Sequence, residues 1–328
     1  MPAIPDENGC QAAFDRAEVP SHYLEDDRMT ITARPYRDER DLEAMRHLLM
    51  SARREAHRAG YLHVGDVVWR VCDTLNAYDP RRAVEVWEGD TGDLIGFALH
   101  YPMYAGFNLQ VHPGYRGGTL EERMLARTER RARRLARQEG HAGAIDAWDV
   151  FEEDADRIAL LTRRGFARRS DNVYYLAARS LNASIPAPAP PAGYLIRGLA
   201  GDEDAAERVA HKPAATTERY KEFMRTPGYE SELDLVAEAP DGRFGAYCIC
   251  WLDQANGVGL LEPVGTRPGF RRRGLARAVV LEGLRRMKAR GAHTALVCFE
   301  GDNAPARRLY ESVGFGVRST IYTYTKGA

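Results

Sequence analysis

The chain has 328 residues, a length that suits two domains of ordinary size better than one compact mixed domain. Hydrophobic residues make up 44% of the sequence, enough to build buried cores, so widespread disorder is excluded. The 46 basic residues nearly cancel the 47 acidic ones, and the net charge of -1 argues against a dedicated nucleic-acid or membrane-surface binder.

The sequence also favours one cellular compartment. It contains no apolar run of bilayer-spanning length, and residues 1–15 lack the basic and apolar regions of an export signal. The five cysteines are scattered, and no histidine pair stands at zinc spacing beside Cys248 and Cys250. We therefore expect a reduced, cytoplasmic protein, monomer or homodimer, with no membrane contact and no bound metal.

The first half is expected to contain an N-terminal arm followed by a domain in which strands and helices alternate. Residues 1–28 are polar and without periodicity, which predicts an N-terminal arm. Residues 29–180 then form the first predicted domain. Its expected strands are 31–34, 83–88, 94–101, 107–112, 142–148 and a last one reaching 176, and its expected helices are 41–58, one ending at 138, and 154–164.

A proline-rich linker separates this domain from a second one. Four prolines between residues 185 and 193 predict an extended, semi-rigid spacer within the boundary 181–193. Residues 194–328 then repeat the order of the first domain. The expected strands are 194–197, 233–238, 244–251, 257–264 and 294–298, and the expected helices are pieces within 202–224, 273–290 and 303–313.

Short sequences recur at equivalent places in the two halves. Residues 113–116 read PGYR and residues 268–271 read PGFR, and Gly165-Phe166 parallels Gly314-Phe315. A repeat of this length indicates a domain duplication. The order of elements predicts an α/β (mixed α+β) fold of two tandem domains, each a mostly antiparallel mixed sheet flanked by helices.

The turn at residues 271–276, with the sequence RRRGLA, joins a strand to a long helix. The first amides of a helix lack internal partners and lie at its positive dipole end, so they bind phosphate oxygens. The small residues Gly274 and Ala276 permit close approach, and the arginines add positive charge. The turn predicts a pyrophosphate site, whereas such a hexapeptide standing alone is often only an exposed basic helix start.

A second motif follows this turn and supports a family resemblance. Residues 262–276 read EPVGTRPGFRRRGLA and residues 303–315 read NAPARRLYESVGF. With a (Gln/Arg)-x-x-Gly-x-(Gly/Ala) signature and a late tyrosine in this order, the chain resembles the GNAT superfamily of acyl-CoA-dependent N-acyltransferases. The resemblance covers residues 194–326 well and 29–178 more loosely. It implies that acetyl-CoA is the co-substrate and that acetyl passes directly to an amine of a small molecule in the C-terminal domain.

The resemblance also implies roles for single residues. The amide of Val264 would polarise the thioester carbonyl, Tyr310 would protonate the departing thiolate, and Glu262 would take the ammonium proton. The implied cofactor contacts are Val264, Thr266, Arg271, Arg272, Arg273, Gly274, Leu275, Ala276 and Asn303.

Each of these roles has an alternative. Tyr310 also fits a core aromatic, Asn303 a helix N-cap, and Glu262 a substrate anchor or buried ion pair. An acyl-cysteine on Cys298 is conceivable, but a buried structural thiol is favoured.

The acceptor pocket is expected in the helical region 211–231 together with Glu262. The predicted substrate contacts are Tyr220, Phe223, Tyr229 and Glu230, although such aromatics also fit a packing role.

The first copy has lost the motif. Residues 116–121 read RGGTLE, so Thr119 and Glu121 stand where the second copy has its small residues. The carboxylate of Glu121 would take the place of phosphate oxygens at the helix N-terminus. Leu161 and Asp154 stand at the positions of the tyrosine and asparagine. We expect a degenerate domain without turnover, in which a CoA site without chemistry is still conceivable.

The helix that follows carries seven arginines between residues 120 and 138. Interspersed acidic residues predict a solvated face with i,i+4 ion pairs rather than a nucleic-acid patch.

Two other functions compete with small-molecule acetylation. A protein N-terminal or lysine acetyltransferase would need an open groove. A non-catalytic acyl-CoA-binding sensor would bind the cofactor without thiol release.

Overall fold

The computed structural model describes residues 31–56, 60–72, 79–210 and 216–327. The predicted N-terminal arm, 1–28, and the first part of the predicted acceptor region, 211–215, lie outside these residues.

The first half contains five helices and seven strands among the described residues. The strands are β1 (Thr32–Pro35), β2 (Val84–Glu88), β3 (Leu94–Tyr101), β4 (Gly106–Val111), β5 (Ile145–Phe151), β6 (Ala167–Arg168) and β7 (Tyr174–Ser180). The helices are α1 (Glu39–Ala56), α2 (Val64–Cys72), α3 (Pro80–Ala83), α4 (Thr119–Gln138) and α5 (Ala155–Arg163).

The second half repeats this order, as the duplicated sequence predicts. Its strands are β8 (Leu195–Gly198), β9 (Asp234–Glu238), β10 (Phe244–Asp253), β11 (Val258–Thr266), β12 (Thr294–Glu300) and β13 (Gly316–Lys326). Its helices are α6 (Ala205–Val209), α7 (Thr217–Phe223), α8 (Leu275–Ala289) and α9 (Ala304–Ser312). Strands β2, β3 and β4 are antiparallel and β4 runs parallel to β5, while β9 to β12 repeat this pattern. The predicted mixed α/β fold of two tandem units is confirmed.

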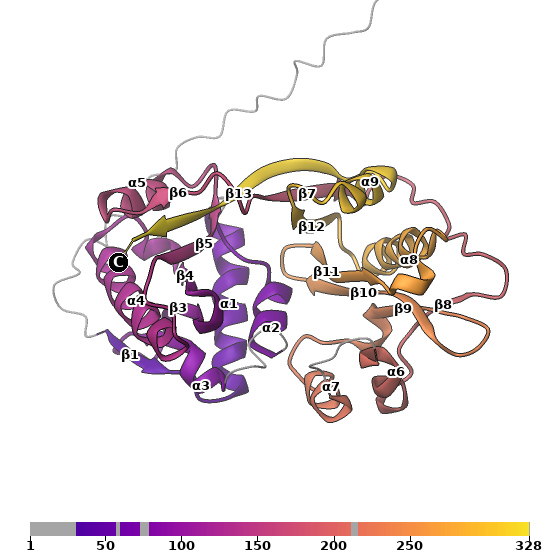
Figure 1. Cartoon of the computed structure of the whole chain (residues 1–328), viewed down its shortest axis with the longest axis horizontal. Coiled ribbons are helices and arrows are strands. Elements are labelled where there is room, and N and C mark those ends of the chain that lie inside the picture. Colours follow the sequence, from indigo (N-terminus) through magenta and orange to yellow (C-terminus); the bar gives the residue numbers. More distant parts are fainter. Residues whose placement is uncertain (1–30, 57–59, 73–78, 211–215, 328) are drawn as a thin grey trace, which may run out of the picture.

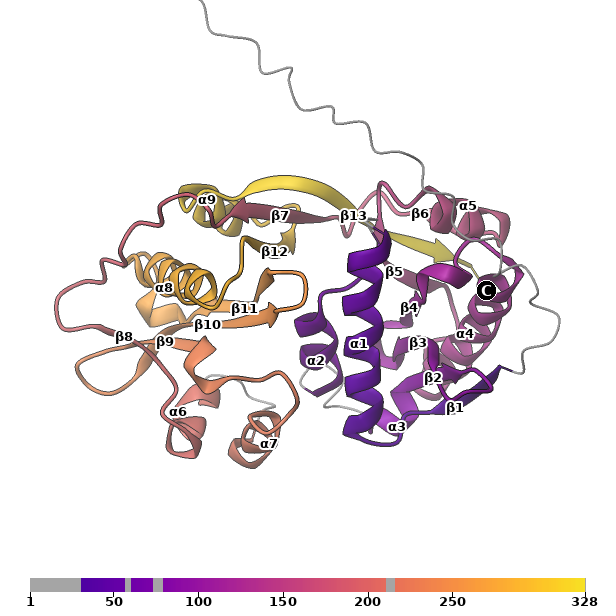
Figure 2. The ribbon, with the colours of Figure 1, turned by 180° about the vertical axis from the view of Figure 1, so that it is seen from behind.

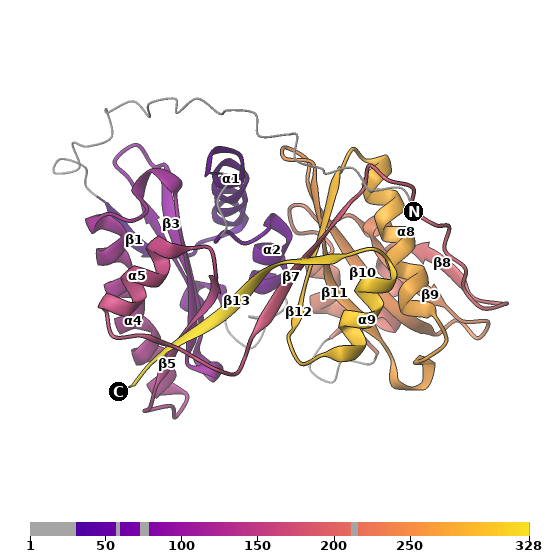
Figure 3. The ribbon, with the colours of Figure 1, turned by 90° about the horizontal axis from the view of Figure 1, so that it is seen from above.

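The last strands of the two halves are exchanged. β7 of the first half lies between β12 and β13, and β13 of the second half pairs with β5 of the first. One continuous sheet results, in the order β1-β2-β3-β4-β5-β13-β7-β12-β11-β10-β9-β8. Figures 1 and 3 show β7 and β13 bridging the two halves. No residue pattern indicates this exchange; the domain boundaries 29–180 and 194–328 stay a prediction.

The two halves also share a hydrophobic core through α2. Val67 and Trp69 of α2 belong to the same buried cluster as Ile249 and Trp251 of β10. Figure 2 shows α2 at the junction, facing the strands of the second half. Gly65 lies so close to β10 that an added Cβ would meet Trp251 side-chain atoms at 2.2 to 2.6 Å. Close packing at Gly65 therefore fixes how the first half sits on the second.

We expect Gly65→Ala to lower the free energy of unfolding by about 1–3 kcal/mol, because the new methyl group overpacks this contact. Denaturant unfolding measures the change. Gly143→Ala is the control, since an added Cβ at Gly143 has no neighbour within 4 Å. Equal stability of the two variants would show that the halves do not pack through this contact.

The proline-rich segment contains no helix or strand, and its first residues contact α8; its role as a spacer stays a prediction. The Lys288 Nζ donates to the carbonyl oxygens of Asn182 and Ala183 at 3.2 and 2.9 Å, and Ile185 is buried. Across the described ranges, no helix has the length and apolar character needed to cross a membrane.

Candidate active site

The turn between β11 and α8 has the geometry expected of a phosphate site. A 3-10 turn, Pro268–Phe270, ends β11, and residues 271–274 are exposed. Arg272 and Gly274 have left-handed backbones, with φ of 61° and 76°. Gly274 is the N-cap of α8 and provides no side-chain acceptor. The first amides of α8 therefore keep their hydrogen-bonding capacity for an anion.

Strand β11 separates from β12 immediately before this turn. The two strands pair only from Val258 to Leu260, whereas β10 stays paired with β11 as far as Thr266. A bulge places Glu262 and Pro263 opposite a single residue of β10. The open edge around Val264 and Thr266 suits an extended chain added like another strand.

Tyr310 lies on α9 behind this open edge. Its side chain is 6% exposed and packs against Phe299 and Phe315, with ring centroids 5.4 and 5.9 Å apart. Burial raises the pKa of the Tyr310 phenol, and the nearby Cys248 and Glu262 raise it further. The phenol is therefore protonated, the form that an acid needs, although its packing equally suits a core aromatic.

Asn303 caps the helix that carries Tyr310. Its Oδ1 accepts a hydrogen bond of 3.0 Å from the Ala306 amide, so the N-cap interpretation is confirmed. A cofactor contact by Asn303 stays a prediction.

A pocket of about 620 Å³ lies where Glu262 meets the first half. Its lining from the second half includes Glu262, Cys298, Glu300 and Tyr322. The first half contributes Asp66, Trp69, Arg70, Tyr101, Tyr104, Asp146, Trp148, Asp149, Arg169, Asn172 and Tyr174. These first-half residues could not be predicted from the sequence, because they follow no motif and only the packing of the halves brings them to Glu262.

An ion pair from the first half is central to this pocket. Arg70 holds Asp149 in a bidentate pair, with N–O distances of 2.5 and 3.0 Å, and Asn108 donates to the same carboxylate at 2.9 Å. A second cavity of about 390 Å³ shares Arg70, Asp149, Asp66 and Cys298 with the pocket. The two cavities therefore adjoin at the ion pair.

Two other side chains that line the pocket, Asp66 and Cys298, have shifted pKa values. Burial raises the pKa of Asp66 despite the opposing charge of Arg70, and burial raises the pKa of the Cys298 thiol. The Cys298 thiol is therefore protonated near neutral pH.

The four predicted substrate contacts lie elsewhere. The hydroxyls of Tyr220 and Tyr229 donate to the buried Asp234, and Phe223 packs edge-on against Trp69 and Trp251. Glu230 lies 3.4 Å from Arg290. None of the four lines the pocket that contains Glu262. Their role as substrate contacts stays a prediction; in the structure they form internal hydrogen bonds, ring contacts and an ion pair.

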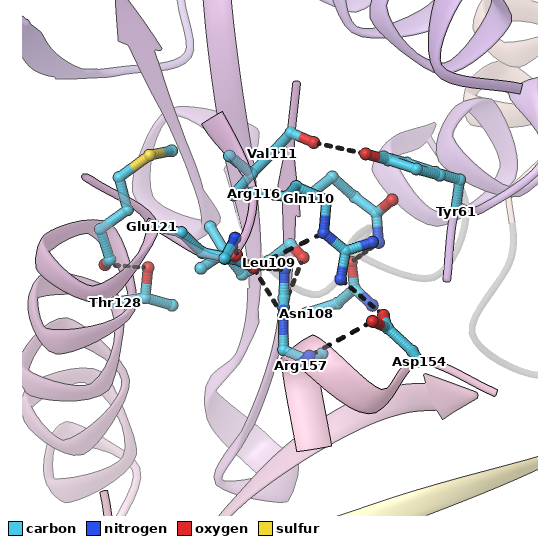
Figure 4. Close-up of polar contacts among 12 residues, drawn as sticks. Tyr61, Asn108, Leu109, Gln110, Val111, Arg116, Glu121, Thr128, Asp154 and Arg157 are labelled. Carbon is cyan, nitrogen blue, oxygen red and sulfur yellow. Dashed lines mark hydrogen bonds and ion pairs between the residues drawn. The ribbon is translucent and has the colours of Figure 1, made fainter. Parts of the chain in front are cut away.

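In the first half, the turn equivalent to residues 271–276 is filled by the chain itself (Figure 4). The Glu121 side chain is fully buried and accepts 2.6 Å contacts from the Gly117 amide and from Arg157, with Arg116 at 3.7 Å. Burial works to raise the pKa of Glu121, but Arg157, Arg116 and the Gly117 amide together hold it below its ordinary value. A carboxylate thus occupies the position that phosphate oxygens would take.

The neighbouring strand edge is also filled. Leu109 and Val111 are the repeat equivalents of Val264 and Thr266. The Leu109 carbonyl accepts from Arg157 at 2.9 Å, and the Val111 carbonyl accepts from the Tyr61 hydroxyl at 3.0 Å (Figure 4). Side chains of the first half therefore take up the edge that stays open in β11.

We expect Glu121→Gln to lower the free energy of unfolding by about 3 kcal/mol, because it leaves buried guanidinium charge without its carboxylate. The matched control is Glu122→Gln, which alters an exposed neighbour and should change little. Since the folded-state pKa of Glu121 is depressed, its stabilisation is complete above the unfolded-state pKa and is lost as pH falls through the folded-state pKa. Chemical unfolding of both variants at neutral and acidic pH measures this; an equal loss in both would refute the buried-pair account.

These features indicate an enzyme that binds an acyl-CoA next to a second substrate. They are the separation of β11 from β12, the exposed turn at residues 271–276, and the side chains of Tyr310 and Glu262. Residues 203–315 match the Acetyltransferase (GNAT) family. Mycothiol acetyltransferases from Kineococcus radiotolerans and Thermobispora bispora are 29% and 30% identical over 254 and 249 residues, covering 73% and 71% of this chain and 80% of each relative.

A solved tandem GNAT protein from the clavulanic acid biosynthesis pathway shares the fold, with a TM-score of 0.64 at 18% identity, over 91% of this chain and 98% of that one. The chain belongs to the GNAT family. It is an N-acetyltransferase with a tandem layout like that of mycothiol synthase. Acetyl-CoA is the cofactor of this family. Within the described residues, no group of three or more His, Cys, Asp or Glu side chains is arranged to hold a metal ion.

Proposed function

We propose that this enzyme transfers acetyl from acetyl-CoA to the amine of a small polar molecule, with the chemistry in the second half and the acceptor held between the halves. The pocket of about 620 Å³ shared by Glu262 and the first half carries this proposal. Its volume is in the range of small-molecule sites.

The residues of the second half fit acetyl-CoA. The amides and arginines of residues 271–276 would hold the pyrophosphate, and the open edge of β11 at Val264 and Thr266 would hold the pantetheine arm. Acetyl-CoA supplies the thioester that the acceptor amine attacks.

Three groups of the chain then act on the reacting atoms. Glu262 takes the proton of the acceptor ammonium, directly or through water, because it lies in the pocket at the bulge of β11. The amide of Val264 donates to the carbonyl oxygen as negative charge develops. The hydroxyl of Tyr310 donates its proton to the departing thiolate.

Direct transfer is favoured over an acyl-cysteine. Cys298 lines the pocket, but burial raises the pKa of its thiol, and a protonated thiol is a poor nucleophile. The thiols of Cys248 and Cys250 form no disulfide, which fits the cytoplasm as the location.

The lining of the pocket indicates the class of acceptor. Carboxylates from both halves, among them Asp66, Glu262 and Glu300, attract a cationic amine, and the aromatic side chains of Trp69 and Trp148 also line the pocket. The relatives are named mycothiol acetyltransferases, so a mycothiol-type amine is the first acceptor to test.

The experiment is thiol release from acetyl-CoA across a library of small polyhydroxylated amines, with peptides bearing free N-termini or lysines alongside. We expect release with a small amine. Faster release with peptides would support protein acetylation instead, and tight acetyl-CoA binding without release from any amine would support a sensor.

We expect Asp66→Asn to raise the KM for the acceptor about tenfold, the effect of one lost charge-assisted contact, with the Kd for acetyl-CoA unchanged. Asparagine keeps an oxygen that can accept the 2.9 Å hydrogen bond from the His63 amide, so the fold is retained. Asp241→Asn, at an exposed turn, is the control. An unchanged acceptor KM in Asp66→Asn would place the acceptor outside this pocket.

A further inference from the structure

A groove on α4 is built almost entirely from arginine. It has a volume of about 450 Å³. Helix α4 lies on the outer side of the first half, away from the second half (Figures 1 and 3). Its lining consists of Arg127, Arg130, Arg131, Arg133, Arg134, Arg137 and Glu85. The groove shares no residue with the acceptor pocket or with the turn at residues 271–276.

The i,i+4 ion pairs expected on this helix are mostly not formed. Glu121 and Glu129 are buried: Glu121 binds Arg157, and Glu129 binds Arg164 and Lys326. Only Arg133 pairs in the expected way, with Glu129 at 3.5 Å. The interspersed carboxylates therefore leave most of the arginines uncompensated.

The lining of the groove contains one negative charge, Glu85, which forms an ion pair with Arg127 at 2.9 Å. Arg130, Arg134 and Arg137 form no hydrogen bond or ion pair with any residue in the described part of the chain. They follow each other at spacings of four and three, and so share one face of the helix over about 10 Å. Like charges at this spacing repel one another unless an anion lies between them.

Buried polar atoms beside the groove also lack partners. His100 of β3 is fully buried, and neither of its ring nitrogens has a hydrogen-bond partner among the described residues; the Nε of Arg131 is in the same state. Burial, with the charges of Arg131 and Arg134, lowers the pKa of His100 to about 3, so its ring is neutral. Polar groups left without partners in this way destabilise a fold. Of the two residues, Arg131 lines the groove and His100 does not.

The chemistry of the groove selects the kind of anion. Guanidinium groups pair bidentately with phosphate oxygens. The lining contains no aromatic side chain on which a base could stack and no apolar side chain that could enter a bilayer. We propose that the α4 groove binds a linear polyphosphate, a chain of linked phosphate groups recognised without a base.

The test is calorimetric titration of the full chain with a short inorganic polyphosphate. Saturating CoA is present so that the turn at residues 271–276 is occupied. We expect one saturable site whose affinity falls with salt. Arg130→Ser with Arg134→Ser should weaken binding at least tenfold and reduce the slope of log affinity against log salt by about 2.

The matched control is Arg225→Ser with Arg243→Ser, which removes the same charge from exposed arginines that pair with Asp202 and Asp241. This control should bind as the parent does. Thermal melting checks the fold, and if the double variant melts early the single variant Arg137→Ser should still show a partial loss. Equal weakening in groove and control variants, or no saturable binding, would overturn the proposal. Equally tight binding of polyglutamate or duplex DNA would overturn the choice of ligand.

Discussion

Replacing Ala276 by glutamate is expected to weaken acetyl-CoA binding at least 100-fold without unfolding the protein. Ala276 is the repeat equivalent of Glu121, whose carboxylate fills the turn of the first half by accepting from the Gly117 amide and from Arg157. A carboxylate at residue 276 would reach the free amides of its own turn, beside Arg271. Loss of two charge-assisted phosphate contacts corresponds to about two powers of ten in affinity.

The matched control is Ala276→Gln, which has nearly the same size and no charge. Calorimetric titration with acetyl-CoA measures the affinities, and thermal melting confirms that both variants fold. The glutamine variant adds the same bulk without the charge, so it should lose less affinity than the glutamate variant, by about the effect of the added anion. If both variants bind acetyl-CoA as tightly as the parent, the turn at residues 271–276 does not hold the phosphates.

Replacing Tyr310 by phenylalanine is expected to lower kcat by about 10²–10⁴-fold, the usual contribution of a positioned acid. The ring still packs against Phe299 and Phe315, so the Kd for acetyl-CoA and the melting temperature should change little. Steady-state kinetics with the best acceptor, together with acetyl-CoA titration, separates the two effects.

Tyr175→Phe is the control for the core role of Tyr310, because Tyr175 packs against the same Phe299, with ring centroids 5.9 Å apart. It should leave kcat near the parent value. An unchanged kcat in Tyr310→Phe would show that Tyr310 is a core aromatic and that another group protonates the thiolate.

Much of the second half could be predicted from local sequence rules. The apolar spacing and Gly291 indicated α8, which the structure places at Leu275–Ala289. The residue type of Asn303 indicated a helix cap, and the cap is present. The negative charge of Glu121 at a helix start indicated a turn that does not bind phosphate, and the Glu121 carboxylate fills that turn.

The acceptor pocket could not be predicted in this way. The exchange of β7 and β13 depends on backbone hydrogen bonds between strands. Because these bonds do not require particular side chains, the sequence does not reveal the exchange. Asp66 and Arg70 lie on α2, a helix that was not predicted from the sequence, and Asp149 lies at a bulge of β5. These residues meet Glu262 only because Gly65 allows α2 to pack directly on Trp251.

Most of the i,i+4 ion pairs expected on α4 are not formed, for a tertiary reason; only Arg133 pairs with Glu129 in this way on α4. Helical spacing allowed Glu129 to pair with Arg133, but burial turns this carboxylate toward Arg164 and Lys326 as well. Helical spacing alone does not show which side of a helix is buried against the rest of the fold.

The number of acetyl-CoA molecules bound per chain tests the central claim most directly. Calorimetric titration of the parent should give one site per chain, and the Ala276→Glu variant should give none at the same concentrations. Two sites in the parent, or one site of unchanged affinity in Ala276→Glu, would contradict a filled first half and a working second half.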